Sequence, residues 1–407
     1  MLNSLPTDWE VVTMADIADG KNGIVDGPFG SNLKLSDYID DAINGVPVLT
    51  TKNLNGDYSA SSVRYISKEK FETLKRSAVF PGDIIVAKIG SIGKCGIYPM
   101  DQRTALIPAN LLKITLKPDI DRKYVYYYIQ SSGFQKRIKA IATATAQPAF
   151  NVTKFRKLPF PLPSLYQQNC IVSRIEELFS ELDNGVETLR KTKQQLAVYR
   201  QAVLKDTFSG CDKQVSVSSV CTHVTDGDHM PPPKAASGIP FIMISNIDGN
   251  KIDFSQTAFV GRDYYENIDS KRRPQVGDVL YSVTGSFGIP VLVDFEKEFC
   301  FQRHIALLRP NDSILSRYLY YAMQAPDVYA QASKGATGTA QKTVGLTVLR
   351  KIMIPYTESK TEQERIVRDV EHKMSVCDQI EKTVDTALQQ AEAMRQSILK
   401  KAFEGEI

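Results

Sequence analysis

The pattern of apolar and polar positions along the chain predicts two globular segments. Up to about Pro163, short β-rich runs such as 46–49 and 83–87 are punctuated by Gly, Pro and Asn, which is typical of strands joined by turns. One helix is predicted inside this segment, over about 122–141. The same succession of short strands and turns recurs over 211–357. Each segment is therefore predicted to be a mixed α+β domain.

After each globular segment the apolar spacing becomes that of one long helix. A proline-rich breaker at 159–163 is followed by apolar residues at alternating steps of four and three, and the same steps recur from about residue 358 onward. A seam of this length is typical of a coiled coil. The predicted seam residues are Ile171, Ile175, Leu178, Leu182, Gly185, Leu189, Thr192, Leu196, Tyr199 and Val203 in the first helix and Ile366, Val370, Lys373, Cys377, Ile380, Val384, Ala387, Ala391, Met394 and Ile398 in the second, and Gly185 and Lys373 are its weak points.

We expect these two helices to pair with each other as an antiparallel coiled coil, with a globular domain near each end. The first helix must lead from one globular domain to the next, and the second must return if the two halves are equivalent. About 40 residues at 1.5 Å each give a rod of roughly 60 Å. The alternative is two independent helices, each packed on its own domain.

The chain repeats itself at an offset close to 195 residues. Arg200–Lys205 returns as Arg395–Lys400, and Gly82-Asp83 returns as Gly277-Asp278. The predicted seams of the two helices share this offset. The predicted fold class is therefore α+β, with two mixed α/β domains alternating with two long helices and an internal pseudo-two-fold repeat. Such symmetry suits a partner that is itself nearly two-fold, and duplex DNA is the commonest partner of this kind.

Four segments follow from these patterns: globular domains at 1–163 and 211–357, and helical segments at 164–210 and 358–407. The first globular domain carries 21 Lys and Arg against 15 Asp and Glu, a net charge of +6, and the second carries 15 against 14, a net charge of +1. Phosphate contacts need local positive charge, so this distribution allows nucleic-acid binding. A chain with a net charge of only +4 is expected to bind DNA weakly alone and to need a partner that supplies more cations.

The composition is that of a soluble globular protein. Apolar residues make up 43% and charged residues 24% of the chain, and no apolar run approaches the roughly 18 residues of a membrane span. The N-terminus lacks the basic stretch and apolar core of a signal peptide. Six scattered cysteines without a Cys-x-x-Cys pair suit a reducing cytosol. We expect a cytoplasmic protein without a membrane partner.

Motifs for catalysis or metal binding are weak throughout the chain. The Asn/Asp-Pro-Pro-aromatic motif of adenine methyltransferases is absent from the sequence, and residues 90–94 lack the spacing of a phosphate-binding loop. The Cys, His and Asp residues at 221–229 lack the paired ligand spacing of a structural zinc site. We interpret residues 226–234 as a surface loop that reaches DNA, and we predict neither a catalytic nor a metal site.

The order of these features resembles the specificity subunit of type I restriction–modification systems. Leu5-Pro6 through Trp9 is similar to the opening of that family, and the repeated Gly-Asp before an apolar run is similar to its mid-domain motif. Pro161-Leu162-Pro163 before Gln167-Gln168 resembles the junction at which the family's globular domain enters its helical region. Pro355 and Glu362-Gln363 are the equivalent in the second half. The resemblance covers essentially the whole chain.

This resemblance implies a non-catalytic DNA-recognition protein. In the family, each globular domain is a target-recognition domain for one half of a bipartite, asymmetric DNA sequence. The helices fix the gap between the half-sites and dock two methyltransferase subunits, which bind S-adenosylmethionine and methylate adenine. A restriction subunit that uses ATP and Mg²⁺ completes the complex. The expected partners are thus double-stranded DNA and these two kinds of subunit in a bacterial or archaeal cytoplasm, with no cofactor on this chain.

Three loop regions recur in both halves and combine Gly with side chains that suit phosphates and base edges. The candidate DNA-binding residues are Ser31, Lys34, Asn53, Lys88, Ser91, Lys94, Thr145 and Gln147 in the first half and His229, Lys234, Asn246, Arg272, Arg273, Ser286, Thr339, Gln341 and Lys342 in the second. Gln147 and Gln341 are the first choices for adenine, although they can instead support their loops from behind. For Asn53 and Asn246, which precede turn glycines, a structural role and a DNA role stay equally open.

Two other classes of function remain compatible with the sequence. One is an interaction scaffold whose globular domains bind protein, and the other is an enzyme with an unrecognised site. A silent member of the family, which assembles but directs no modification, is a third alternative. Strong, salt-sensitive DNA affinity in the assembled complex would exclude the scaffold.

Overall fold

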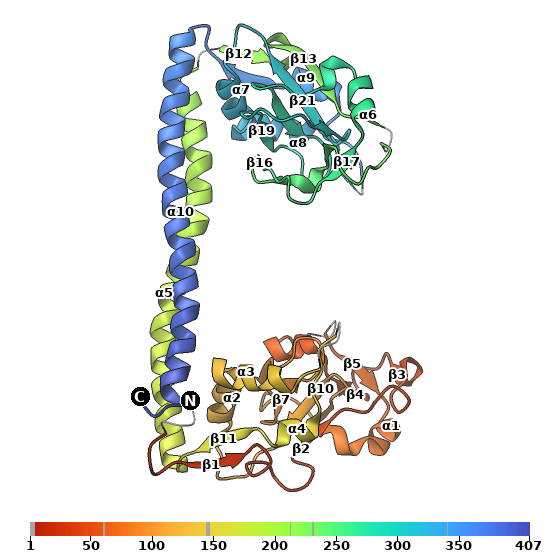
Figure 1. The fold of residues 1–407 in the computed structure, drawn as a ribbon, viewed down its shortest axis with the longest axis vertical. Coiled ribbons are helices and arrows are strands. Elements are labelled where there is room, and N and C mark those ends of the chain that lie inside the picture. Colours follow the sequence, from red (N-terminus) through yellow and green to blue (C-terminus); the bar gives the residue numbers. More distant parts are fainter. Residues whose placement is uncertain (1–4, 60–61, 144–146, 212, 230–231, 340) are drawn as a thin grey trace. The chain divides into compact units, whose positions relative to one another are not determined.

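The computed structural model describes residues 5–59, 62–143, 147–211, 213–229, 232–339 and 341–407. The chain divides into two compact units: unit 1 comprises Met1–Thr188 and Thr386–Ile407, and unit 2 comprises Leu189–Asp385. Each unit contains one globular part and portions of two long helices, α5 (Leu165–Phe208) and α10 (Lys360–Ala402) (Figure 1). The prediction of mixed α/β domains together with two long helices is confirmed.

A four-stranded antiparallel sheet of order β2-β10-β7-β8 lies at the centre of the globular part of unit 1. A five-stranded sheet has the order β3-β5-β4-β9-β6, and β1 pairs with β11. The strands are β1 (Glu10–Thr13), β2 (Ile24–Asp26), β3 (Tyr38–Ile39), β4 (Val46–Val48), β5 (Arg64–Ile66), β6 (Ala78–Val79), β7 (Ile84–Ala87), β8 (Cys95–Ile97), β9 (Ala105–Leu106), β10 (Leu111–Ile114) and β11 (Pro159–Leu162).

The short helices of unit 1 are α1 (Lys68–Thr73), α2 (Arg122–Gln130), α3 (Ser132–Ile141) and α4 (Val152–Arg156). The prediction of a single helix over 122–141 is wrong, because the chain breaks at Ser131. The backbone of Ser131 is extended, and its hydroxyl accepts a hydrogen bond from the amide of Phe134 at 3.3 Å. Ser131 therefore ends α2 and caps the start of α3.

Aromatic residues join the globular part of unit 1 to the end of α10. The ring of Phe403, which follows α10, lies 5.1 Å from the rings of Tyr124 and Tyr128, and all three side chains are buried. The Tyr124 hydroxyl donates a hydrogen bond to the carbonyl of Pro161 at 3.1 Å, so its polar atom is satisfied inside the core. These contacts place the end of α10 in the hydrophobic core of unit 1.

Unit 2 also has a four-stranded antiparallel sheet, of order β13-β21-β18-β19. A three-stranded sheet has the order β17-β14-β20, and two further pairs are β12-β22 and β15-β16. The strands are β12 (Lys213–Ser216), β13 (Cys221–Asp226), β14 (Ile239–Ile242), β15 (Ile247–Asp248), β16 (Lys251–Ile252), β17 (Ala258–Val260), β18 (Val279–Ser282), β19 (Pro290–Leu292), β20 (Cys300–Phe301), β21 (Ile305–Pro310) and β22 (Met353–Tyr356).

The short helices of unit 2 are α6 (Arg262–Asn267), α7 (Ser316–Ala322), α8 (Pro326–Gly335) and α9 (Leu346–Lys351). The core of this unit takes in the end of α5, where the ring of Phe208 lies 5.5 Å from that of Tyr318. The Tyr318 hydroxyl donates to the carbonyl of Pro355 at 3.3 Å, as the Tyr124 hydroxyl does to Pro161 in unit 1. Corresponding residues thus make the same hydrogen bond in both units.

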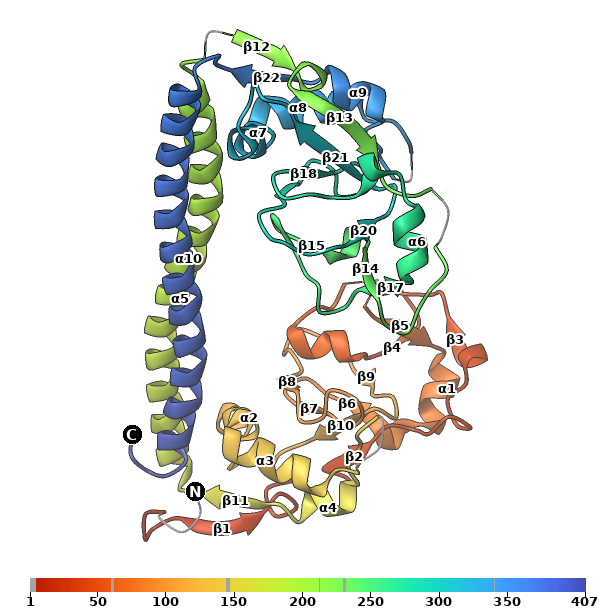
Figure 2. The ribbon, with the colours of Figure 1, turned by 45° about the horizontal axis from the view of Figure 1, so that its top comes forward.

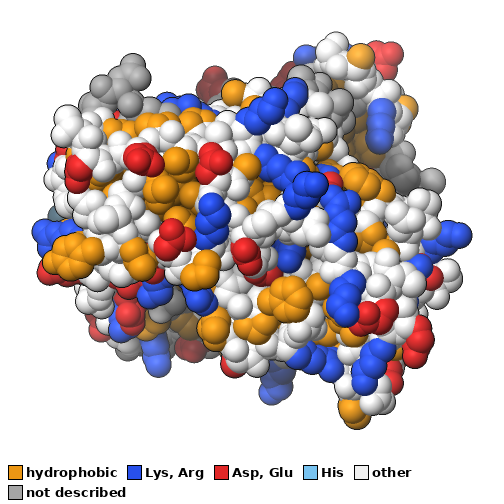
Figure 3. All heavy atoms as spheres, turned by 90° about the horizontal axis from the view of Figure 1, so that it is seen from below, with side chains coloured by type: hydrophobic (Ala, Val, Ile, Leu, Met, Phe, Trp, Pro, Cys, Tyr) orange, Lys and Arg blue, Asp and Glu red, His pale blue; other side chains and the backbone are white. Residues whose placement is uncertain are grey.

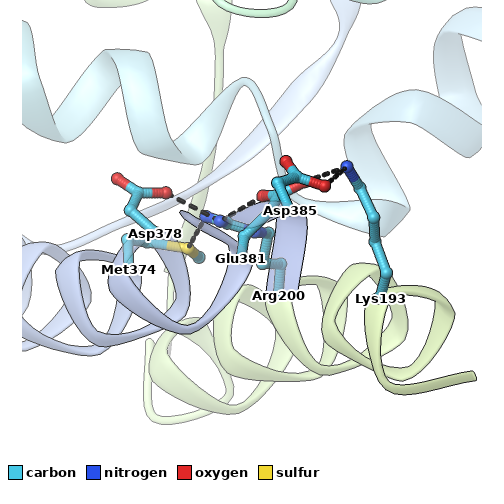
Figure 4. Close-up of polar contacts among 6 residues, drawn as sticks. All are labelled: Lys193, Arg200, Met374, Asp378, Glu381 and Asp385. Atoms are coloured by element: carbon cyan, nitrogen blue, oxygen red, sulfur yellow. Dashed lines mark hydrogen bonds and ion pairs between the residues drawn. The ribbon is translucent and has the colours of Figure 1, made fainter. Parts of the chain in front are cut away.

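Within each unit the two long helices run side by side in opposite directions (Figures 1 and 2). In unit 2, Lys193 contacts Asp385 and Arg200 contacts Asp378, both at 2.7 Å, so the residue numbers fall along α10 as they rise along α5 (Figure 4). In unit 1, Arg395 of α10 contacts Asp183 of α5. No helix in the described ranges has the length and apolar character needed to cross a membrane.

Most of the predicted seam faces away from solvent. Buried members are Ile171, Ile175, Leu196, Val203, Ile366, Val370, Cys377, Val384 and Ala391, and half-buried members are Leu178, Leu182, Leu189, Thr192, Lys373, Ala387 and Ile398. By contrast, four predicted members are exposed and lie outside the buried face, namely Gly185, Tyr199, Ile380 and Met394. A helix with 3.6 residues per turn drifts against a strict repeat of 3.5, which accounts for such departures. Leu204 and Leu399, each next to a predicted position, are both 1% exposed.

Candidate nucleic-acid interface

Two strands of the four-stranded sheet in unit 1 end at the same edge. Both β2 and β7 run antiparallel to β10, with Asp26 opposite Leu112 and Ala87 opposite Leu111. Their carboxyl ends therefore flank the start of β10. This arrangement brings together two predicted loops that are far apart in the sequence. The loop after β2 carries Ser31 and Lys34, and the loop after β7 carries Lys88, Ser91 and Lys94.

The third predicted loop of unit 1 lies against the second. The amide of Gly90 donates to the carbonyl of Pro148 at 3.1 Å, and the amide of Phe150 donates to the carbonyl of Lys88 at 3.3 Å. Gly90 and Gly93 have φ values of 79° and 81°, which favour glycine and allow the loop to turn sharply. Residues 27–34, 88–95 and 147–150 thus form one surface, the unit 1 loop cluster.

Unit 2 builds a corresponding surface from corresponding strands. Both β13 and β18 run antiparallel to β21, with Asp226 opposite Ala306 and Ser282 opposite Ile305. The amide of Gly285 donates to the carbonyl of Lys342 at 3.0 Å, which joins the second and third predicted loops as in unit 1. We call residues 227–229, 232–234, 284–288, 337–339 and 341–343 the unit 2 loop cluster.

Most of the candidate residues in the two loop clusters are exposed. These are Ser31, Lys34, Ser91, Lys94 and Gln147 in unit 1, and His229, Lys234, Ser286, Thr339, Gln341 and Lys342 in unit 2. Thr145 lies outside the described residues. On the face of the molecule shown in Figure 3, Lys and Arg side chains are interspersed with hydrophobic and acidic ones.

Three candidates are buried and have partners within the protein. Lys88 is 5% exposed, and its ammonium lies 2.6 Å from the Asp26 carboxylate, so a phosphate contact would require this ion pair to break. The Asn53 amide oxygen accepts from the backbone of Thr50 at 2.5 Å, and the Asn246 oxygen accepts from the backbone of Met243 at 2.9 Å. These hydrogen bonds give both asparagines a structural role, which is one of the two alternatives that the sequence left open.

The two arginines after α6 have different surroundings. The Arg273 guanidinium donates to the carbonyl of Ile268 at 2.9 Å and lies over the ring of Tyr265, so it supports its own loop. Arg272 is half-buried, and its guanidinium lies 3.7 Å from the Asp226 carboxylate. The same carboxylate lies 2.8 Å from the imidazole of His229. Among the residues that the structure describes, no group of three or more His, Cys, Asp or Glu side chains could hold a metal ion.

Each loop cluster borders a recess. In unit 1 the recess has a volume of about 1310 Å³ and is lined in part by Lys94, Gln135 and Lys139. The Gln135 amide donates to the carbonyl of Gly93 at 2.9 Å, which fixes the glycine-rich turn from behind. In unit 2 a recess of about 340 Å³ is lined in part by His229 and His304. Burial, followed by the charge of Arg303, lowers the pKa of His304.

Two buried glutamines that sequence reasoning did not select as functional residues connect each long helix to its globular part. The Gln168 side chain accepts a hydrogen bond from the amide of Asp121 at 2.8 Å and donates to the carbonyl of Pro163 at 3.0 Å. The Gln363 side chain accepts from the amide of Leu315 at 2.8 Å and donates to a carbonyl in the same way. Both glutamines belong to the junction motif that the sequence repeats, and this repetition is the signal by which they could have been selected.

An ion pair reinforces each of these connections. Lys123 of α2 lies 2.7 Å from Glu176 of α5, and Arg317 of α7 lies 2.5 Å from Glu371 of α10. Both pairs are partly exposed, so each contributes little to the free energy of unfolding. They add one more contact between each long helix and its globular part to those of the buried glutamines.

A globular part with a polar loop cluster, joined to a long helix, is present in both units, and this repeated arrangement is the architecture that the comparisons below place in a family. The family described as type I restriction modification DNA specificity domain matches residues 6–196 and 231–390. The chain belongs to this family, and thus to the specificity subunits of type I restriction–modification systems.

Individual relatives match over nearly their whole length. The chain is 23% identical to the type I restriction enzyme EcoBI specificity subunit of Escherichia coli, over all of this chain and 88% of that protein. It is 23% identical to the StySPI specificity subunit of Salmonella potsdam, with 99% and 90% covered. Among solved structures, a chain of a type I restriction–modification system has a TM-score of 0.71 at 18% identity, with 99% of both chains covered. The HsdS subunit of Thermoanaerobacter tengcongensis has a TM-score of 0.52, also at 18% identity, with 99% and 98% covered. These structures show the same fold.

Proposed function

We propose that this chain recognises a bipartite, asymmetric DNA target, with one half-site for each globular part. The observation that carries the proposal is one arrangement present in both units. In each unit a loop cluster lies at one edge of a four-stranded sheet, and a buried glutamine joins the globular part to a long helix. The exposed candidate residues of the two loop clusters are the proposed DNA contacts. The loops differ in sequence between the units, so the two half-sites differ.

The two long helices act as an antiparallel coiled coil that sets the gap between half-sites. Support comes from two ion pairs that are related by the 195-residue offset. Arg200 contacts Asp378 in unit 2, and their counterparts Arg395 and Asp183 are in contact in unit 1. The contacts of an internal pseudo-two-fold repeat are expected to occur in such pairs. Helices of 44 and 43 residues extend about 65 Å.

The functional segments are the target-recognition domains at 1–163 and 211–357 and the spacer helices at 164–210 and 358–407. The helices also dock two methyltransferase subunits. Exposed apolar side chains on the unit 2 portions of α5 and α10 support a protein partner there, namely Val198, Tyr199, Val376 and Ile380. A restriction subunit completes the complex.

The chain contributes recognition, and its partners contribute chemistry. S-adenosylmethionine binds the methyltransferase subunits, and ATP and Mg²⁺ bind the restriction subunit. The chain itself is non-catalytic and carries no cofactor, and the assembled complex acts on double-stranded DNA in the cytoplasm.

Co-expression with the methyltransferase subunit of its own system tests this function. Methylated adenines mapped across the host genome are expected to mark a split motif, with two short half-sites around a fixed, unspecified gap. A soluble three-chain complex that adds no methylation would contradict the proposal and favour a silent subunit or a protein-binding scaffold.

A further inference from the structure

An exposed aromatic side chain stands at the tip of the first loop of unit 1. Phe29 is 57% exposed, and it is flanked by Pro28 and Gly30 in the turn that follows β2. A single exposed phenylalanine on a protein surface needs no explanation by itself. Its surroundings are unusual, however, because a buried ammonium lies against the ring and tight contacts fix the backbone of its loop.

The Lys88 side chain lies against one face of the Phe29 ring. The ammonium of Lys88 lies 4.6 Å from the centroid of the Phe29 ring and 2.6 Å from the Asp26 carboxylate. Burying a lysine is unfavourable unless the charge is paired, and here the carboxylate and the ring together satisfy it. The buried cation therefore positions an aromatic ring, and a phosphate contact by Lys88 stays a prediction.

The backbone of the loop is also fixed. A Cβ atom at Gly27 would lie 2.2 Å from the carbonyl carbon of Pro108, so only glycine fits there, and the amide of Gly27 donates to the carbonyl of Leu111. Pro28 restricts φ. The amide of Asn32 donates to the carbonyl of Phe29 at 2.8 Å and closes the turn. The ring is thus presented on a rigid support within the unit 1 loop cluster.

The corresponding position in unit 2 carries different chemistry. Asp26-Gly27-Pro28-Phe29 corresponds to Asp226-Gly227-Asp228-His229, and the His229 imidazole lies 2.8 Å from Asp226. Unit 2 therefore presents an imidazole that can hydrogen-bond to a base or a phosphate, whereas unit 1 presents an apolar ring at the same place. A hydrogen-bond contact is available at this position only in unit 2.

We propose that Phe29 is a specificity-determining residue that contacts the methyl group of a thymine in the half-site recognised by unit 1. This inference rests on the proposed function. The thymine methyl is the apolar group that base pairs present in the major groove, and a phenylalanine has no hydrogen bond to offer. Insertion of the ring between two base pairs would require both of its faces, and Lys88 already occupies one. The free face and edge of the ring suit a methyl contact.

Replacing single thymines by uracils in the mapped target tests the proposal with the assembled complex. Removing the contacted methyl group is expected to weaken DNA binding by the wild-type complex about fourfold, and at one position of one half-site only. The complex with Phe29→Ala should bind the thymine target more weakly by a similar factor. Its binding should no longer change when uracil replaces thymine at that position. Phe29→Leu should keep the sensitivity. Ile43→Ala, which shortens an 85% exposed apolar side chain elsewhere in unit 1, should match the wild type.

The outcomes separate this inference from the proposed function. If the wild-type complex shows no sequence preference, the proposed function fails. If it recognises a split target but Phe29→Ala keeps the wild-type response to every uracil, only the assignment of Phe29 is overturned. A 2-aminopurine signal of unstacking that depends on Phe29 would also overturn it, in favour of insertion between bases.

Discussion

Arg200 of α5 and Asp378 of α10 form an ion pair at 2.7 Å, and the residues 195 positions away from each, Arg395 and Asp183, are also in contact. The Arg200 guanidinium additionally lies 3.0 Å from Glu381 (Figure 4). The repeated Arg-Gln motif at the ends of the long helices therefore marks the position at which each helix is held to the other.

Reversing the charge of Arg200 should weaken the helix pair in unit 2. Arg200→Glu is expected to cost about 0.5–1 kcal/mol or somewhat more, because the lost attraction is replaced by repulsion from two carboxylates. The midpoint of urea unfolding measures the effect. Arg190→Glu, on the exposed face of the same helix, is the control. Combining the variant with Asp378→Arg should restore part of the loss, and additive effects would argue against a direct interaction.

Removing the Gln168 side chain should loosen the junction between α5 and the globular part of unit 1. Gln168→Ala leaves the amide of Asp121 and the carbonyl of Pro163 without their partner, which is expected to cost about 1–3 kcal/mol. Gln195→Ala, an exposed glutamine in the same helix, should change the urea midpoint little. Equal effects of the two substitutions would show that the buried hydrogen bonds do not matter.

A charge placed on the buried face of α5 should separate the helices, whereas the same charge on its outer face should not. Leu196 is 8% exposed and Val198, two residues later, is 71% exposed. Leu196→Asp is expected to cost about 3 kcal/mol or more, since it buries an unpaired carboxylate. Val198→Asp should stay near the wild-type melting temperature. Similar melting temperatures for the two variants would contradict the observed helix pairing.

Unit 2 should lose stability as the pH falls towards 5. The pKa of His304 lies below its usual value in the folded protein, because burial and the neighbouring Arg303 disfavour the charged imidazole. The unfolded chain therefore binds more protons below about pH 6.5, and the free energy of unfolding decreases as pH falls through this range. His304→Gln should flatten the curve of unfolding midpoint against pH, and His372→Gln, an exposed histidine in α10, should not. An unchanged curve in the His304 variant would exclude this source of pH dependence.

The parts of the fold that could be predicted from the sequence are those with local signals. The heptad spacing located both long helices, and the alternation of short strands with turns indicated the mixed domains. The break at Ser131 was not predicted, because a serine that caps a helix within an apolar pattern resembles an ordinary helical residue. The Gly-Asp motif recurs for a structural reason. Gly82 and Gly277 adopt positive φ, and the carboxylates of Asp83 and Asp278 accept backbone hydrogen bonds within their turns.

The candidate site was harder to predict, because its residues meet only through sheet register. Lys88 and Asp26 are 62 positions apart, and nothing in the local sequence shows that they form a buried ion pair beneath Phe29. Arg273, predicted to face DNA, contacts Ile268 and Tyr265 in its own unit, and its contact with DNA stays a prediction. A charged residue in a loop has the same local pattern whether it faces solvent or a neighbouring strand.

The most direct test of the account is to exchange one globular part and map the methylation that results. Residues 1–157 of this chain would be replaced by the corresponding segment of another family member, and the hybrid would be co-expressed with the same methyltransferase subunit. If each globular part recognises one half-site, only one half of the methylated motif should change, while the other half and the gap stay as they were. A motif altered in both halves would contradict the assignment of one half-site to each unit.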